Sequence, residues 1–211
     1  MKLRSASPAL LFTLISLSTV APLAADEPPA PGAVKLGVDR EGVPAPVEGI
    51  EGVERRLYLD GRVYVAGQPS ADALRRFREL GVTAVVNLRT PAEMDDRERV
   101  PYDEAALAAE LGMEYVHLPI GGDDQPFRPE VLDGLRDALA RHPGPVLLHC
   151  TVAWRAGNVW MAYLVREEGF TLDAAVARGK AMDLGDEPLE LLLGRPVKLV
   201  FADEPAPTAA P

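Results

Sequence analysis

Residues 145–157 have the sequence Pro145-Val-Leu-Leu-His149-Cys150-Thr-Val-Ala-Trp-Arg155-Ala-Gly157, the most informative stretch of the chain. It passes from a short apolar strand through a loop into a helix, and the loop holds Cys150, the single cysteine of the chain. Backbone N–H groups at a helix N-terminus are unpaired and carry partial positive charge, so they stabilise a thiolate and bind oxyanions. Arg155 can bind two oxygens of the same anion. The stretch therefore predicts a nucleophilic cysteine beside an anion-binding loop.

The alternative for Cys150 is a place in the core, because free cysteines often pack as small apolar side chains. Three features favour the chemical interpretation. Polar His149 interrupts the apolar run just before the cysteine, Arg155 follows after four residues, and an apolar helix begins at once.

Strands and helices alternate along the chain. A hairpin is expected over 57–65, where two short apolar runs flank Asp60-Gly61, a strong turn pair. Further strands are expected at 82–88, 114–118 and 145–150, helices at 70–80, 103–111, 129–141, 155–168, 171–182 and 187–193, and an acidic helical or irregular piece at 91–100. This alternation predicts a three-layer α/β fold with a mainly parallel central sheet flanked by helices. In such sheets ligands bind at the carboxyl ends of strands, where Cys150 lies.

The N-terminal residues 1–25 have the composition of a secretory signal peptide. Lys2 and Arg4 precede an apolar run, and small residues precede Asp26. The run is short for a transmembrane helix, and an uncleaved membrane anchor is the alternative. We therefore expect a periplasmic or secreted protein without stable membrane insertion after cleavage. Residues 26–50 are expected to form a flexible lead-in, 51–202 the catalytic domain and 203–211 a disordered tail.

Composition and charge argue against a nucleic-acid partner, an internal disulfide and a metal site. The formal net charge of −10 argues against a nucleic-acid partner. A single cysteine cannot form an internal disulfide. The three histidines, His117, His142 and His149, lack the spacing of metal ligands, so we expect neither a metal site nor another cofactor.

Three segments, Val65-Ala-Gly-Gln-Pro-Ser70, Val85-Val-Asn-Leu-Arg89 and His149–Trp160, occur in this order. Together they resemble the cysteine-based phosphatase superfamily, and more closely its bacterial branch that includes the beta-lactamase hydrolase-like, phosphatase-like domains. The resemblance spans roughly residues 57–195. It implies a phosphatase-like fold that needs no cofactor. It also implies hydrolysis of a phosphate monoester, either a phosphorylated small molecule or a phosphoprotein, through a phosphocysteine.

The resemblance also implies roles for individual residues. Cys150 corresponds to the nucleophile and Arg155 to the oxyanion clamp, while His149 supports the loop and favours the thiolate. Either Asp123 or Asp124, in the Gly-containing segment 119–126, corresponds to the general acid on a mobile loop; alternatively, both aspartates simply solvate a turn. The backbone amides of the anion cradle are those of Thr151, Val152, Ala153, Trp154 and Arg155. Arg89 either orients the site or pairs with an acid such as Glu93.

The loop departs from the usual phosphatase pattern. The usual loop has five residues between cysteine and arginine, and here there are four. That spacing occurs in the same bacterial branch and also resembles the loop of rhodanese-type sulfurtransferases. Ala153 stands where glycine is common, Trp154 is bulky, and Ala156 replaces the usual Ser or Thr. Two alternatives therefore stay open: a rhodanese-like sulfurtransferase that forms a Cys150 persulfide, and a non-catalytic module that binds a phosphate or sulfate ligand.

Overall fold

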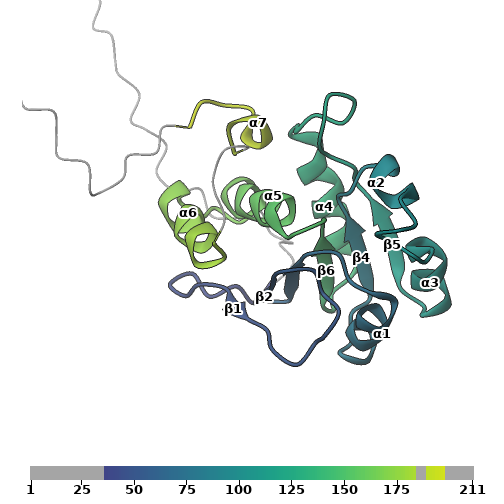
Figure 1. Ribbon diagram of the computed structural model, residues 1–211. Coiled ribbons are helices and arrows are strands. Elements are labelled where there is room, and N and C mark those ends of the chain that lie inside the picture. The colour runs from purple at the N-terminus through teal and green to yellow at the C-terminus, as the bar shows by residue number, and fades with distance from the viewer. Residues whose placement is uncertain (1–35, 184–188, 198–211) are drawn as a thin grey trace, which may run out of the picture.

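The structure, a computed structural model, describes residues 36–183 and 189–197 of the chain (Figure 1). Its strands are β1 (Ala45–Pro46), β2 (Leu57–Asp60), β3 (Val63–Ala66), β4 (Ala84–Asn87), β5 (Glu114–His117) and β6 (Val146–His149). They form one sheet in the order β1-β2-β3-β6-β4-β5. Strands β3, β6, β4 and β5 run parallel, and β1 and β2 extend one edge in antiparallel fashion.

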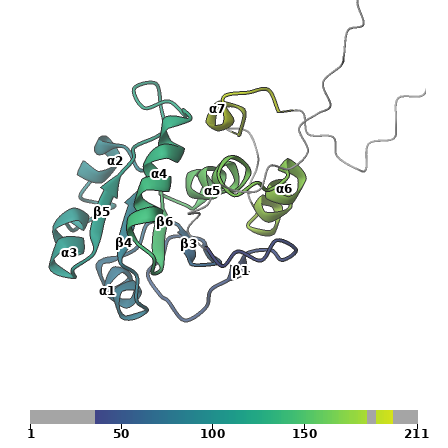
Figure 2. The same ribbon diagram turned by 180° about the vertical axis from the view of Figure 1, so that it is seen from behind.

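The helices cover both faces of this sheet. They are α1 (Ala71–Glu79), α2 (Pro91–Asp95), α3 (Glu104–Glu110), α4 (Glu130–Arg141), α5 (Trp154–Arg166), α6 (Leu172–Ala181) and α7 (Leu189–Leu193). Helices α1 and α3 pack on one face, α4 and α5 pack on the other, and α6 and α7 lie against α5 (Figures 1 and 2). The predicted three-layer α/β fold with a mainly parallel sheet is therefore confirmed.

Strand β6 is the strand that positions Cys150. All four of its residues are buried, with Leu147 facing the α1 and α3 side and Val146 and Leu148 facing the α4 and α5 side. The chain runs outward from β4 to β5 and then returns to place β6 between β3 and β4. The connecting helices change face at this return: α3 packs on the same face as α1, and α4 packs on the opposite face with α5. Such a switch point opens a crevice at the carboxyl ends of the strands, and Cys150 follows β6 there.

Local sequence signals account for the elements around this crevice. The predicted hairpin forms between β2 and β3, with Asp60 opposite Val63 and Gly61 at a φ of 60°. Ser70 caps α1, because its hydroxyl accepts a 3.1 Å hydrogen bond from the Ala73 amide. The apolar face of α1 then buries Phe77 beneath the sheet.

The chain outside this frame shows differences from the sequence interpretation. Residues 36–50 lie in the segment expected to be a flexible lead-in, yet β1 pairs with β2 and Leu36 is buried. In the acidic segment 91–100 only the first half forms a helix, α2, and the rest forms turns. The expected signal peptide and C-terminal tail lie outside the described residues, so the domain boundaries stay predictions. None of the helices within 36–183 and 189–197 is long and apolar enough to cross a membrane.

Candidate active site

The segment after β3 holds the cysteine loop in place. The Cys150 amide donates to the Ala66 carbonyl at 3.2 Å, and the Gln68 amide donates to the Thr151 carbonyl at 3.0 Å. Between them Gly67 forms a β-bridge with Val152. A Cβ at Gly67 would lie 1.9 Å from a backbone oxygen on its other side, so only glycine fits here. The first of the three family-like segments therefore supports the cysteine loop.

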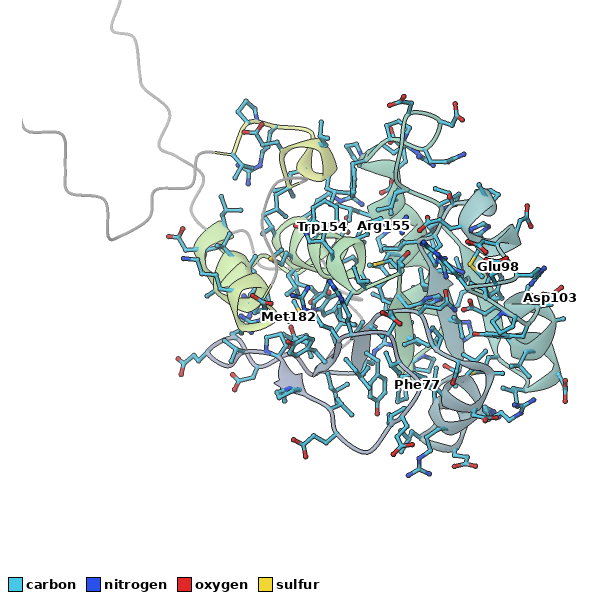
Figure 3. The ribbon with its side chains drawn as sticks, in the orientation of Figure 1. Phe77, Glu98, Asp103, Trp154, Arg155 and Met182 are labelled. Atoms are coloured by element: carbon cyan, nitrogen blue, oxygen red, sulfur yellow. The ribbon has the colours of Figure 1, made fainter. Side chains whose placement is uncertain are left out.

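The loop turns into α5 at Ala153, which has a φ of 71°. This left-handed conformation costs a non-glycine residue about 1 kcal/mol, which explains why glycine is common at this place. Ala153 is fully buried, and Cys150, three residues earlier, is only 1% exposed. Trp154 and Arg155 begin α5 (Figure 3), so the unpaired amides at the start of a thirteen-residue helix follow the cysteine directly.

Arg155 is bound by a carboxylate. Its two Nη atoms donate to the two oxygens of Glu93 at 2.8 and 2.6 Å, and Nη2 also donates to the Thr151 hydroxyl at 2.9 Å. Burial lowers the pKa of Arg155, but Glu93 and the neighbouring Cys150 raise it by more, so that the net pKa is raised. The guanidinium is thus fixed in its charged form next to the thiol.

Glu93, which the sequence suggests only as a partner for Arg89, binds both Nη groups of Arg155 and so holds the site's cation in place. It is the third residue of α2 and forms a capping box with Thr90. Burial raises the pKa of the Glu93 carboxyl, but hydrogen bonds from Arg155 and Thr151 outweigh it and bring the pKa to about 2. Glu93 is therefore ionised at neutral pH and holds no proton to donate. The Thr-x-x-Glu spacing directly after a buried strand was the available signal.

Arg89 contacts Glu93, the acid that the sequence suggests as its partner. Its side chain is buried, with Nε 3.7 Å from a Glu93 oxygen and Nη2 donating to the Glu93 carbonyl at 3.1 Å. Its Nη1 donates to the side-chain oxygen of Gln68 at 2.5 Å. Arg89 thereby ties the β3 segment to α2 and helps to orient the acid that binds Arg155.

His149 contacts a second buried acid, Glu104, which sequence reasoning missed. The His149 Nε2 lies 2.7 Å from a Glu104 oxygen, and both side chains are fully buried. The other Glu104 oxygen accepts a 3.0 Å hydrogen bond from Gln68. Burial raises the pKa of Glu104, but His149 and the neighbouring donors lower it by more. The available signal was an acid on the apolar face of a helix, three and four residues before Leu107 and Ala108.

Asp123 and Asp124 are exposed in the loop between β5 and α4. Gly121 and Gly122 precede them with φ values of 127° and 74°, conformations that glycine adopts readily. The two ends of the loop contact the cysteine loop. At one end the Ile120 carbonyl accepts a 2.7 Å hydrogen bond from Arg155. At the other end Phe127 packs edge-on against Trp154, with ring centroids 5.9 Å apart. The two exposed aspartates therefore lie on a loop whose ends contact the cysteine loop.

A cavity of about 720 Å³ adjoins the cysteine loop at Thr151. Its walls also include Val53, Gln68, Arg89, Arg99 and Tyr102. Among the described residues, no group of three or more His, Cys, Asp or Glu side chains is arranged to hold a metal ion. Chemically, the arrangement combines a buried thiol, a fixed cation, a helix N-terminus and a neighbouring groove for an organic group.

This geometry defines the class. A mainly parallel sheet with a Cys-to-Arg loop at its carboxyl edge is the arrangement of the cysteine-based phosphatase superfamily. Residues 57–164 match the family model described as "Beta-lactamase hydrolase-like protein, phosphatase-like domain", and the chain belongs to this family.

Individual relatives agree with this assignment. A curated protein of Xylella fastidiosa (strain 9a5c), the "Beta-lactamase hydrolase-like protein", is 27% identical over 133 residues, covering 62% of this chain and 30% of the relative. The chain thus spans about a third of that protein's length. The solved structure of PTPMT1 in complex with PI(5)P is similar with a TM-score of 0.55 and 17% identity, over 68% of this chain and 94% of that one. The active form of Tk-PTP is similar with a TM-score of 0.51 and 24% identity, over 69% and 98% of the two chains. These structural likenesses show the fold, and the family supports a phosphatase.

Proposed function

We propose that this domain hydrolyses phosphate monoesters through a phosphocysteine on Cys150. The observation that carries the proposal is the contact set of Arg155, which lies beside the thiol at the start of α5 and is held by Glu93. A cation fixed by two hydrogen bonds to one carboxylate keeps its position without substrate, and such preorganisation is what stabilises charge in a transition state.

In the first step the Cys150 thiolate attacks phosphorus and the bond from phosphorus to the ester oxygen breaks. The loop amides from Thr151 to Trp154 bind the phosphoryl oxygens as charge redistributes. Arg155 adds its positive charge and its Nε donor, since its two Nη groups are held by Glu93, Thr151 and Ile120. The leaving oxygen takes a proton from a carboxylic acid. In the second step water attacks phosphorus, the same carboxylate accepts its proton, and the phosphorus–sulfur bond breaks to release inorganic phosphate and the thiolate.

The proton donor is Asp123 or Asp124. Of the acids placed around the loop, Glu93 is ionised with a pKa of about 2, and Glu104 is buried behind His149 with a lowered pKa. The two aspartates lie on a loop whose glycines permit motion and whose ends contact Arg155 and Trp154. Closure of this loop over a bound ester would bring one carboxyl to the leaving oxygen.

Two further expectations remain proposals. We propose that the substrate is a phosphorylated small molecule or a phosphoprotein; the relative PTPMT1 was solved with PI(5)P, a phosphorylated small molecule. We also propose export to the periplasm or secretion, on the composition of residues 1–25. The family and the fold do not favour the sulfurtransferase and binding-module alternatives, and both are outcomes of the test below.

The test is phosphate release from a panel of phosphomonoesters by reduced protein, with Cys150→Ser and Arg155→Lys. We expect release by the unchanged protein, none by Cys150→Ser, and a large loss with Arg155→Lys because lysine lacks the planar fork. Binding of phosphate that survives Cys150→Ser, without turnover by any form, would support the binding module instead. Transfer of sulfane sulfur to Cys150, without phosphate release, would support the sulfurtransferase.

A further inference from the structure

The groove beside Thr151 is placed to hold the part of the substrate that leaves. Thr151 follows Cys150 directly, and its hydroxyl contacts Arg155 and Glu93. Thr151 also lines the 720 Å³ cavity. An ester whose phosphoryl group occupies the loop therefore extends its organic group into this cavity. The volume lies within the range of sites that bury a small organic molecule. This step rests on the proposed phosphatase function.

The polar side chains of the inner groove wall, Gln68 and Tyr102, have few hydrogen-bonding groups left for a ligand. The Gln68 side chain accepts from Arg89 at 2.5 Å and donates to Glu104 at 3.0 Å. The Tyr102 hydroxyl donates to the Pro69 carbonyl at 2.8 Å. With these polar groups occupied, the inner wall presents the Tyr102 ring beside apolar surface that includes Val53 and Pro69. The charged residues Glu54, Asp72 and Arg99 also line the groove and are exposed to solvent.

A ligand rich in hydroxyl groups is poorly matched to such a wall. Hydroxyls that lie against the inner wall, away from the exposed carboxylates of Glu54 and Asp72, would lose water without gaining partners, which costs free energy for each buried group. An aromatic or aliphatic ring loses nothing polar and gains apolar burial. The groove therefore favours a ring over a sugar or another polyol.

Arg99 is the lining residue of the groove that can bind an acidic group of a ligand. Its side chain is 75% exposed and contacts Asp96 only through Nε, at 3.5 Å. No hydrogen bond joins its Nη atoms to another residue of the described ranges, so this edge can bind an acid by two parallel hydrogen bonds. Glu54 and Asp72 also line the groove and would repel an acidic group near them. The charges thus give a bound ligand one favoured orientation.

We propose that this groove binds the leaving group of the substrate and selects a small phosphomonoester of a ring-sized, largely apolar alcohol or phenol with one further acidic group, which pairs with Arg99. The second acid adds ground-state binding at a distance from the reacting phosphorus. It therefore acts through KM more than through kcat.

The test compares four probes: phenyl phosphate, para-carboxyphenyl phosphate, its neutral para-carbamoyl analogue and a hexose phosphate. We expect the carboxy ester to have a higher kcat/KM than the carbamoyl ester, with the hexose ester lowest. Arg99→Gln should reduce the carboxy-to-carbamoyl ratio about fivefold, the size of an exposed ion pair, through KM. Added salt should reduce the ratio in the unchanged protein as well.

The matched control is Arg76→Gln. Arg76 is also an exposed arginine with an acid three residues away, Glu79 at 2.8 Å, but it lies on α1 outside the groove. Its ratio should equal that of the unchanged protein. Turnover of aryl esters with no effect of Arg99→Gln on the ratio, preference for the hexose ester, or preference for a phosphotyrosine peptide over the carboxy ester would each overturn this inference. No turnover of any probe would instead refute the phosphatase function on which it rests.

Discussion

Replacing Glu93 by glutamine separates the role of its charge from that of its shape. Glutamine keeps the side-chain length but removes the negative charge that faces Arg155. The lowering of the Glu93 pKa from 4.5 to about 2 corresponds to about 3 kcal/mol of stabilisation. Because 31% of the side chain is exposed, solvent screening reduces this to about 2 kcal/mol. We expect Glu93→Gln to lose about this much unfolding free energy at neutral pH. We also expect a 10- to 100-fold lower kcat, because Arg155 is no longer held.

The contribution of Glu93 to stability depends on pH. A carboxyl whose pKa is lowered by folding stabilises the protein above its unfolded pKa, and this contribution disappears as the pH falls through the folded pKa. The unchanged protein and Glu93→Gln should therefore converge in stability between pH 4.5 and about 2. Urea unfolding at neutral and acidic pH measures this convergence.

The control for this experiment is Glu114→Gln. The pKa of Glu114 is also about 2, because Arg141 and His142 donate to it, but it lies at the surface on β5. This variant should keep full activity and lose less stability. Equal stability and kcat in Glu93→Gln and the unchanged protein would refute the assignment of Glu93 as the acid that holds Arg155.

Three other predictions follow from the same contacts. Ala153→Gly should raise the unfolding free energy by about 1 kcal/mol, since glycine adopts a φ of 71° without strain; an unchanged or lower urea midpoint would contradict this. Glu104→Gln leaves the His149 ring without its buried acid, so it should destabilise the protein by about 3 kcal/mol and slow alkylation of Cys150. A normal alkylation rate would show that Glu104 does not act on the cysteine through His149. Of Asp123→Asn and Asp124→Asn, one should lower kcat by a factor of about 100 for alkyl phosphates and by less for aryl phosphates, whose leaving groups need less help; equal loss for both ester types would argue against a proton donor.

Much of the fold follows from local signals in the sequence. The Asp60-Gly61 turn, the Ser70 cap and the apolar run before Cys150 each specify an element within a few residues of themselves, and each of those elements forms. The path of the cysteine loop from β6 into α5 could be predicted for the same reason, because its cysteine, arginine and helix start are adjacent in the chain; anion binding by this loop stays a prediction. The alternation of strands and helices predicts a mainly parallel sheet, but it does not predict that β6 lies between β3 and β4.

The acids that support the loop could not be assigned from the sequence. Arg155 lies 62 positions from Glu93, and nothing in the local pattern fixes which carboxylate meets which cation. The same holds for His149 and Glu104, since the burial of a charge depends on partners that only the assembled sheet brings together. The contacts of residues 36–50 could not be predicted for a related reason: the segment 26–50 is rich in proline, glycine and acids, yet Leu36 packs into the core.

The proposed mechanism requires that Cys150 form a covalent bond to phosphorus. Rapid quenching of the reduced protein with an aryl phosphate, followed by mass spectrometry of the peptide that contains residues 145–157, tests it most directly. We expect a phosphoryl group on Cys150 that disappears at the rate of phosphate release, and none on the Cys150→Ser variant. Phosphate release without phosphorylated Cys150 at any time, or equal release by the variant, would refute a phosphocysteine intermediate.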